Sequence, residues 1–228
     1  MMESYARTRD RLEAYFDRTA SATWERLTSD APVSRIRQTV REGRDAMRAH
    51  MLASLPDDLG GARVLDAGCG AGPMTHELAA RGAQVVAVDI SPSLLDVARR
   101  RIPEALHGRI RFVAGDMLAD DLGRFDYVMA MDSLIHYRAD DIAAALARLA
   151  ARTGEKMVFT IAPKTPLLSA MHVAGKLFPR SDRSPRIIPH GQARLAGALR
   201  AAGLGWHLRP LARVSRGFYI SQAMEARP

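Results

Sequence analysis

The chain has 228 residues, of which 47% are hydrophobic and 25% charged, as expected for a globular protein with one sizeable core. None of its apolar runs approaches the roughly 20 residues that span a bilayer. Its single cysteine excludes an internal disulfide, so we expect a cytoplasmic protein. The net charge is +8, and residues 162–228 hold 11 Lys and Arg against 2 Asp and Glu, which indicates an anionic partner for the C-terminal third.

Two amphipathic helices are predicted first, followed by a regular alternation of strands and helices. The alternation is typical of a doubly wound parallel sheet, and Arg216-Gly217 near the end predicts a hairpin. We predict helices at 3–29, 35–55, 73–81, 92–101, 139–152 and 191–202, and strands at 63–66, 84–89, 110–114, 127–131, 156–161, 206–214 and 218–223.

This pattern predicts an α/β fold with a seven-stranded, mostly parallel sheet and three regions. Residues 1–55 are expected to form an N-terminal helical arm that acts as a lid. Residues 56–163 and 191–228 are expected to form the core, and residues 164–190 a cap insertion.

A glycine loop follows the first predicted strand, with Asp66 and then Gly68, Gly70 and Gly72 on alternate positions. A dinucleotide site needs G-x-G-x-x-G, but Pro73 stands where its third glycine would be. Glycines allow close backbone approach, and a preceding carboxylate suits a ligand with a cationic part. The loop therefore predicts S-adenosylmethionine as cofactor, and with seven strands it indicates the Rossmann-like fold of class I methyltransferases.

Further cofactor residues are expected where the next strands end, because ligands of open α/β sheets bind at the carboxyl edge. Asp89 ends the second strand and suits the ribose hydroxyls, while Asp116 follows the third strand and suits the adenine amino group. The complete predicted set is Asp66, Gly68, Gly70, Gly72, Asp89, Ile90, Asp116, Met117 and Met131.

The loop after the fourth strand is expected to face the transferred methyl group. It contains His136, the titratable side chain best placed to act, and Tyr137. It lacks the Asn/Asp-Pro-Pro-Tyr/Phe pattern of many amino-methylating enzymes, which argues against methylation of nucleic-acid bases.

Motifs outside the glycine loop carry a more specific resemblance. They are Tyr15-Phe16-Asp17-Arg18-Thr19-Ala20, Trp24, Val40-Arg41-Glu42-Gly43-Arg44, Asp132-Ser133-Leu134-Ile135-His136-Tyr137, Phe178-Pro179-Arg180-Ser181-Asp182-Arg183-Ser184-Pro185 and Arg216-Gly217-Phe218-Tyr219-Ile220-Ser221. In these the chain resembles the magnesium-protoporphyrin IX O-methyltransferase family of (bacterio)chlorophyll biosynthesis.

The resemblance implies methyl transfer from S-adenosylmethionine to a propionate of magnesium-protoporphyrin IX, leaving the monomethyl ester and S-adenosylhomocysteine. Magnesium is then part of the substrate, and no resident metal is expected. The resemblance also implies catalytic roles for His136 and Tyr15, with Tyr5 as an alternative on the same arm.

On the acceptor side, residues 164–190 combine apolar side chains with arginines, as a flat macrocycle with two carboxylates requires. We expect Tyr137, Met171, Arg180 and Arg183 to bind the porphyrin. The same segment could instead be an ordinary cap helix or a peripheral contact with a photosynthetic membrane. The substrate could also be handed over by magnesium chelatase.

Two other classes of function remain open at this point. A methyltransferase of another lipophilic small molecule, such as a quinone, would share the glycine loop but not the flanking motifs. An RNA-binding or RNA-modifying protein would explain the basic C-terminal third, but 6% aromatic residues and no stacking motif argue against it. We therefore expect no nucleic-acid partner.

Overall fold

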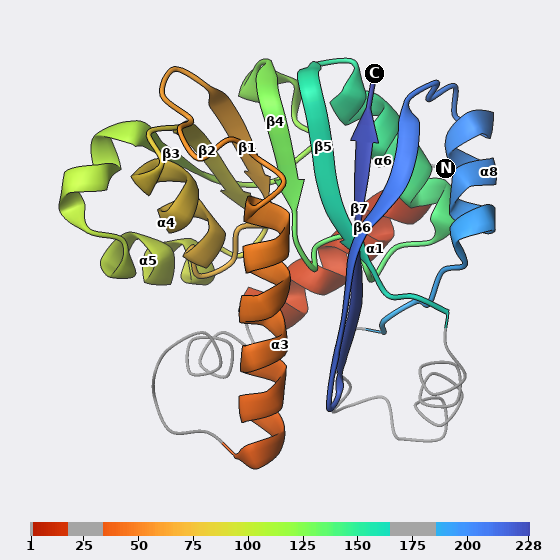
Figure 1. Cartoon of the computed structure of the whole chain (residues 1–228), viewed down its shortest axis with the longest axis horizontal. Coiled ribbons are helices and arrows are strands. Elements are labelled where there is room, and N and C mark those ends of the chain that lie inside the picture. Colours follow the sequence, from red (N-terminus) through yellow and green to blue (C-terminus); the bar gives the residue numbers. More distant parts are fainter. Residues whose placement is uncertain (1, 18–33, 165–185) are drawn as a thin grey trace.

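A seven-stranded sheet in the order β3-β2-β1-β4-β5-β7-β6 forms the centre of the computed structural model, which describes residues 2–17, 34–164 and 186–228 (Figure 1). Strands β1 to β5 pair in parallel, while β7 is antiparallel to both β5 and β6. The predicted seven-stranded, mostly parallel sheet is confirmed. The strands are β1 Arg63–Ala67, β2 Gln84–Asp89, β3 Ile110–Ala114, β4 Phe125–Ala130, β5 Thr153–Ile161, β6 His207–Arg216 and β7 Tyr219–Arg227.

The helices cover the two faces of this sheet. They are α1 Met2–Tyr15, α3 Arg35–Leu52, α4 Pro73–Ala80, α5 Pro92–Arg101, α6 Ala139–Ala150 and α8 Gln192–Ala201, with short 3₁₀ turns η2 Glu104–Arg109 and η3 Asp120–Leu122. Because side chains alternate along a strand, Leu65 faces one apolar cluster and Val64 the other. The first cluster includes α1, α6 and α8, and the second includes α3, α4 and α5. The two described helices of the expected arm thus pack on opposite faces.

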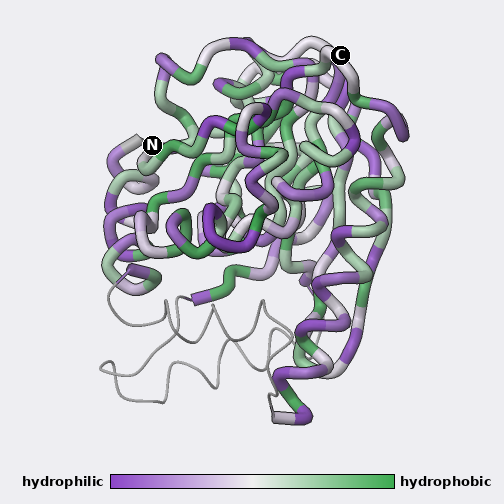
Figure 2. The backbone as a smooth tube through the Cα atoms, turned by 90° about the vertical axis from the view of Figure 1, so that its left-hand side faces the viewer, coloured by the Kyte–Doolittle hydropathy of each residue, from purple (hydrophilic) through white to green (hydrophobic). Residues whose placement is uncertain are grey.

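Helix α3 runs beyond the carboxyl edge of the sheet alongside the β6–β7 hairpin (Figure 1). The approach is close, since a Cβ on Gly43 would lie 2.6 Å from Cδ1 of Tyr219. The projecting half of α3 is mostly hydrophilic with single apolar residues between (Figure 2). None of the described helices is long and apolar enough to cross a membrane.

Strand β7 extends four residues beyond its predicted end at residue 223. The apolar pattern is interrupted there by Glu225, which is fully buried. Its carboxylate pairs with Arg209 at 2.7 Å, Arg227 at 2.6 Å and Lys156 at 3.6 Å. Burial opposes ionisation of Glu225, but these cations outweigh it and lower its pKa to about 2. A charged residue therefore occupies an interior strand, against the hydropathy pattern.

Candidate active site

A cavity of about 270 Å³ opens at the carboxyl edge of the sheet, where the strand order reverses between β1 and β4. Its lining is Leu12, Tyr15, Phe16, Arg44, Gly68, Gly70, Asp89, Ile90, Leu94, Met131, Asp132, Ser133, Ile135, His136 and Ile187. A smaller hollow of about 40 Å³ shares Gly68, Asp89, Ile90 and Ser133 with it and also meets Tyr5, Val88, Gly115, Met117 and Tyr137. The two spaces therefore adjoin at the ends of β1 and β2.

The glycines of the loop after β1 all have positive φ, at 82° for Gly68, 55° for Gly70 and 83° for Gly72. They differ in what surrounds them. A Cβ on Gly68 would lie 2.5 Å from Cβ of Ser133, and one on Gly72 would lie 2.9 Å from Cβ of Ala98. A Cβ on Gly70 would meet no atom within 4 Å. Gly70 therefore presents bare backbone to the cavity, whereas Gly72 allows α4 and α5 to pack closely.

Asp89 connects the glycine loop to the end of β2. Its Oδ2 accepts a hydrogen bond from the Gly70 amide at 2.8 Å, and its Oδ1 accepts one from the Ser91 amide at 2.9 Å. Burial raises the pKa of Asp89, and these amide bonds counteract it. The predicted ribose-binding carboxylate lies against both spaces with its orientation fixed by two backbone groups.

Asp66, a predicted cofactor-binding residue, lies near the end of β1. Its carboxylate is buried, lines neither space and accepts a 2.6 Å hydrogen bond from Oγ1 of Thr75 in α4. Burial raises the pKa of Asp66 to about 7. In the described structure this carboxyl group ties the strand end to α4 beneath the loop, and direct contact with a cofactor stays a prediction.

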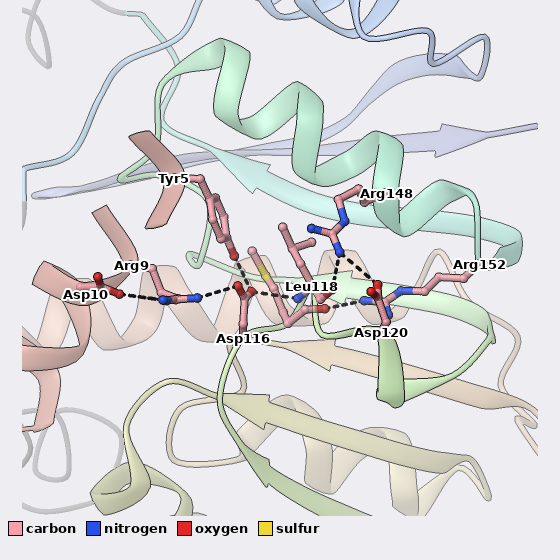
Figure 3. A network of polar contacts seen from close by, with 9 residues as sticks. Tyr5, Arg9, Asp10, Asp116, Leu118, Asp120, Arg148 and Arg152 are labelled. Atoms are coloured by element: carbon pink, nitrogen blue, oxygen red, sulfur yellow. Dashed lines mark hydrogen bonds and ion pairs between the residues drawn. The ribbon is translucent and has the colours of Figure 1, made fainter. Parts of the chain in front are cut away.

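Asp116 is the centre of a polar network that includes helix α1 (Figure 3). Its Oδ1 accepts hydrogen bonds from the Tyr5 hydroxyl at 2.8 Å and the Leu118 amide at 2.9 Å, and its Oδ2 pairs with Arg9 at 3.0 Å. The Tyr5 ring also stacks on Tyr137, with centroids 4.8 Å apart. The carboxylate predicted to bind adenine therefore anchors α1, and its contact with adenine stays a prediction.

The two predicted catalytic residues line the larger cavity together. The ring of Phe16 is close to both, with its centroid 5.2 Å from that of Tyr15 and 6.2 Å from that of His136. Nδ1 of His136 lies 3.2 Å from the Arg186 carbonyl oxygen, which can only accept, so in this contact Nδ1 carries the proton. Burial lowers the pKa of His136, partly offset by that hydrogen bond and by Asp132, which favours a neutral ring with an unprotonated Nε2.

Sequence reasoning missed a cluster around Asp132, which lines the cavity with φ +55°, unusual for a residue with a side chain. Its carboxylate pairs with Arg44 at 2.7 Å and accepts hydrogen bonds from the Tyr219 hydroxyl and Thr160 at 3.2 Å. Arg44 itself lines the cavity beside the glycine loop. Both residues stood in the motifs of the family resemblance, which was the available signal.

The remaining predicted site residues divide into three groups. Ile90 and Met131 line the larger cavity, and Met117 and Tyr137 the smaller one, so the structure brings these four together. Tyr137 stacks on Tyr5 and does not line the larger cavity, although its neighbour in sequence, His136, does. Met171, Arg180 and Arg183 lie outside the described residues.

The strand order, the loop after β1 and the cavity at the switch point together define a class I methyltransferase fold. A family model described as a methyltransferase domain matches residues 64–154, and one described as the C-terminus of magnesium-protoporphyrin IX methyltransferase matches residues 130–228. Magnesium-protoporphyrin O-methyltransferase of Rhodobacter capsulatus is 58% identical over the full length of both chains. The chain belongs to the magnesium-protoporphyrin O-methyltransferase family.

A more distant relative and a solved structure agree with this assignment. Magnesium-protoporphyrin O-methyltransferase of Synechocystis is 31% identical over 93% of both chains. The crystal structure of magnesium protoporphyrin IX methyltransferase from Synechocystis with bound S-adenosylhomocysteine superposes with a TM-score of 0.79 at 30% identity, over 96% of this chain and 98% of that one. The full-length match favours this family over a quinone methyltransferase, which would share the core alone.

Proposed function

We propose that this protein transfers the methyl group of S-adenosylmethionine to a propionate carboxylate of magnesium-protoporphyrin IX, in (bacterio)chlorophyll biosynthesis. The products are the monomethyl ester and S-adenosylhomocysteine. The observation that carries the proposal is a single cavity lined both by donor-side groups, Gly70 and Asp89, and by acceptor-side groups, Tyr15 and His136. Membership of the family supports the choice of acceptor.

The residues at the donor end fit S-adenosylmethionine. Open space over Gly70 admits a ligand against bare backbone, and the Asp89 carboxylate suits a ribose diol. Arg44 is a cation for the carboxylate of the methionine part. When bound, the cofactor supplies an electrophilic methyl group on a sulfonium centre.

The acceptor needs orientation more than deprotonation, because a propionate is already ionised near neutral pH. Attack of a carboxylate on a sulfonium removes two opposite charges, so a pocket that excludes water favours the reaction. The apolar walls of the cavity, Leu12, Phe16, Ile135 and Ile187, supply such surroundings. We infer that Tyr15 and His136 hold the carboxylate or the macrocycle in line with the methyl group.

The tautomer of His136 narrows its role. With Nδ1 directed at the Arg186 carbonyl, Nε2 of the neutral ring has a lone pair and no proton to donate. Such a nitrogen suits the magnesium ion of the substrate better than it suits a carboxylate. We infer that His136 contacts the metal of the porphyrin and so fixes the position of the macrocycle.

The decisive experiment incubates the purified protein with S-adenosylmethionine and magnesium-protoporphyrin IX and follows the gain of a single methyl group by mass spectrometry. Metal-free protoporphyrin and a quinol are incubated in parallel. We expect methylation of the magnesium porphyrin, weaker methylation of the metal-free one and none of the quinol. Methylation of the quinol alone would overturn the assignment of the acceptor.

Contacts outside the cavity are proposed for the membrane and for magnesium chelatase. Ile36 of α3 and Phe218 of the β6–β7 turn are 56% and 57% exposed, and Arg35, Arg37 and Arg213 of the same elements are exposed as well. Exposed apolar groups among cations suit peripheral contact with an anionic membrane. Cosedimentation with anionic vesicles at low and high salt tests this contact. Handover from magnesium chelatase and porphyrin binding by Tyr137, Met171, Arg180 and Arg183 stay predictions.

A further inference from the structure

Asp17 connects the end of the α1 segment to the beginning of α5, across 76 positions of the sequence. Its Oδ1 accepts hydrogen bonds from the Ser91 hydroxyl and the Ser93 amide, both at 3.3 Å, and from the Ser93 hydroxyl. Ser91 is the N-cap of α5 and Ser93 lies in its first turn. Asp17 therefore caps a helix from a distant part of the chain.

The physical chemistry of this contact favours a carboxylate. The first amides of a helix have no partner within the helix, and its N-terminus has partial positive charge. A negatively charged acceptor there forms charge-assisted hydrogen bonds, which are stronger than neutral ones. Asp17 thus attaches the end of the α1 segment to the first turn of α5 in the core.

That attachment lies directly beside the acceptor half of the cavity. Tyr15 and Phe16 immediately precede Asp17, and both line the cavity. Phe16 in turn lies 6.2 Å from His136, measured between ring centroids. A contact that holds Asp17 therefore acts on the chain directly beside these two rings.

Ser91, one of the donors to Asp17, also contacts the donor half. The amide of Ser91 donates to Asp89, while the hydroxyl of Ser91 donates to Asp17. Ser91 is fully buried at the N-terminus of α5. Ser91 therefore contacts both Asp89 on the donor side and Asp17 beside the acceptor side.

We propose that Asp17 is a positioning residue, which holds Tyr15 and Phe16 over the acceptor by capping α5. The expected effect on kcat rests on the proposed function, whereas the expected effect on the attachment of α1 does not. Asp89 is held by the backbone amides of Gly70 and Ser91 and has no bond to Asp17, so we expect the donor half to be unaffected when Asp17 is replaced. Loss of Asp17 then impairs methyl transfer while cofactor binding stays intact.

The test compares Asp17→Ala, Asp17→Asn, Ser93→Ala and the double variant Asp17→Ala/Ser93→Ala. Glu13→Gln, which also removes one negative charge but at an exposed position of α1, is the matched control. Because small misplacements of reacting groups cost up to about 100-fold, we expect Asp17→Ala to lower kcat by about 10-fold. The Kd of S-adenosylhomocysteine should change by less than about 2-fold, or 0.4 kcal/mol. Asp17→Asn keeps the acceptor oxygen and should restore most of the rate.

Ser93→Ala removes one donor from the same contact. If Asp17→Ala does not fold, Ser93→Ala still tests the proposal. We expect an intermediate loss of kcat for Ser93→Ala, and a double variant no worse than Asp17→Ala alone. Wild-type kcat in both single variants, or a loss of S-adenosylhomocysteine affinity equal to the loss of kcat, would overturn the proposal. Additive losses in the double variant would overturn it as well.

Hydrogen exchange provides a readout that needs no porphyrin. Amides of residues 10–17 should exchange faster in Asp17→Ala than in the wild type, and at the wild-type rate in Glu13→Gln. Unchanged exchange in Asp17→Ala overturns the attachment. A wild-type protein that leaves magnesium-protoporphyrin IX unmethylated overturns the proposed function, whereas the exchange result still decides the role of Asp17.

Discussion

The Tyr5 hydroxyl donates a 2.8 Å hydrogen bond to Asp116 Oδ1, which joins the first turns of α1 to the loop after β3. Burial raises the pKa of Tyr5 and keeps the phenol protonated, so it acts as a donor throughout the physiological range. Tyr15, at the other end of the same helix, lines the cavity instead. Tyr5 and Tyr15, the two candidates for the catalytic tyrosine of the arm, therefore have different surroundings.

Tyr5→Phe should mainly reduce stability. The substitution keeps the ring against Tyr137 but removes a hydrogen bond to a charged acceptor, so we expect the free energy of unfolding to fall by about 1–2 kcal/mol. Denaturant titration measures this loss. Because Asp116 keeps its bonds from Arg9 and Leu118, the Kd of S-adenosylhomocysteine should change little, and a large loss of affinity would place Tyr5 in the cofactor site.

Tyr15→Phe should have the converse effect. Its hydroxyl has no hydrogen bond among the described residues, so removing it should leave the denaturation midpoint within error of the wild type. If Tyr15 orients the acceptor, kcat for magnesium-protoporphyrin IX should fall by about 10-fold or more. A variant with full turnover would return the catalytic role to another residue of the arm.

The fold was accessible from the sequence because its signals are local. Alternating strand and helix periods predicted the sheet, and the glycine loop predicted the edge at which the cavity lies. The Asp116 network was not accessible, since Tyr5 and Arg9 reach it from 111 and 107 positions away. Asp66 shows the same limit. A motif predicts that a carboxylate lies near the end of β1, but the Thr75 hydroxyl that donates to it comes from the next helix.

Gly70→Ala and Gly72→Ala should separate ligand approach from packing within one loop. Both residues have positive φ, which costs an alanine about 1 kcal/mol at either position. At Gly70 the added methyl meets open space, so the larger effect should be on the Kd of S-adenosylhomocysteine, measured by calorimetry. At Gly72 it meets Ala98 and Ile102, so the larger effect should be on the free energy of unfolding. Equal effects of both substitutions on affinity would contradict this division.

The pH dependence of turnover should report the neutral state of His136. Its pKa lies below the ordinary 6.5 because burial disfavours the imidazolium, so the ring stays neutral when the pH falls to that value. We expect kcat/KM for magnesium-protoporphyrin IX to be level from pH 8 to about 6.5 and to fall at lower pH as Nε2 is protonated.

His136→Ala should lower turnover and abolish this decrease of kcat/KM at low pH, with an unchanged Kd for S-adenosylhomocysteine. It should also reduce the preference for the magnesium porphyrin over the metal-free one, and a retained preference would exclude the metal contact.

Asp66→Asn should stabilise the protein at neutral pH. The folded-state pKa of Asp66 is about 7, against 3.8 in an unfolded chain, so between these values the folded state holds a proton that the unfolded state releases. The wild type therefore loses stability as the pH rises from about 4 to 7, by at most about 4 kcal/mol from this group. Asparagine is neutral throughout and can still accept from Thr75, so the variant should lack this part of the slope. Denaturant titrations of both proteins at several pH values measure the difference, which should grow with pH and then level off above pH 7. Parallel stability curves would mean that the Asp66 carboxyl group ionises as easily in the folded state as in the unfolded one.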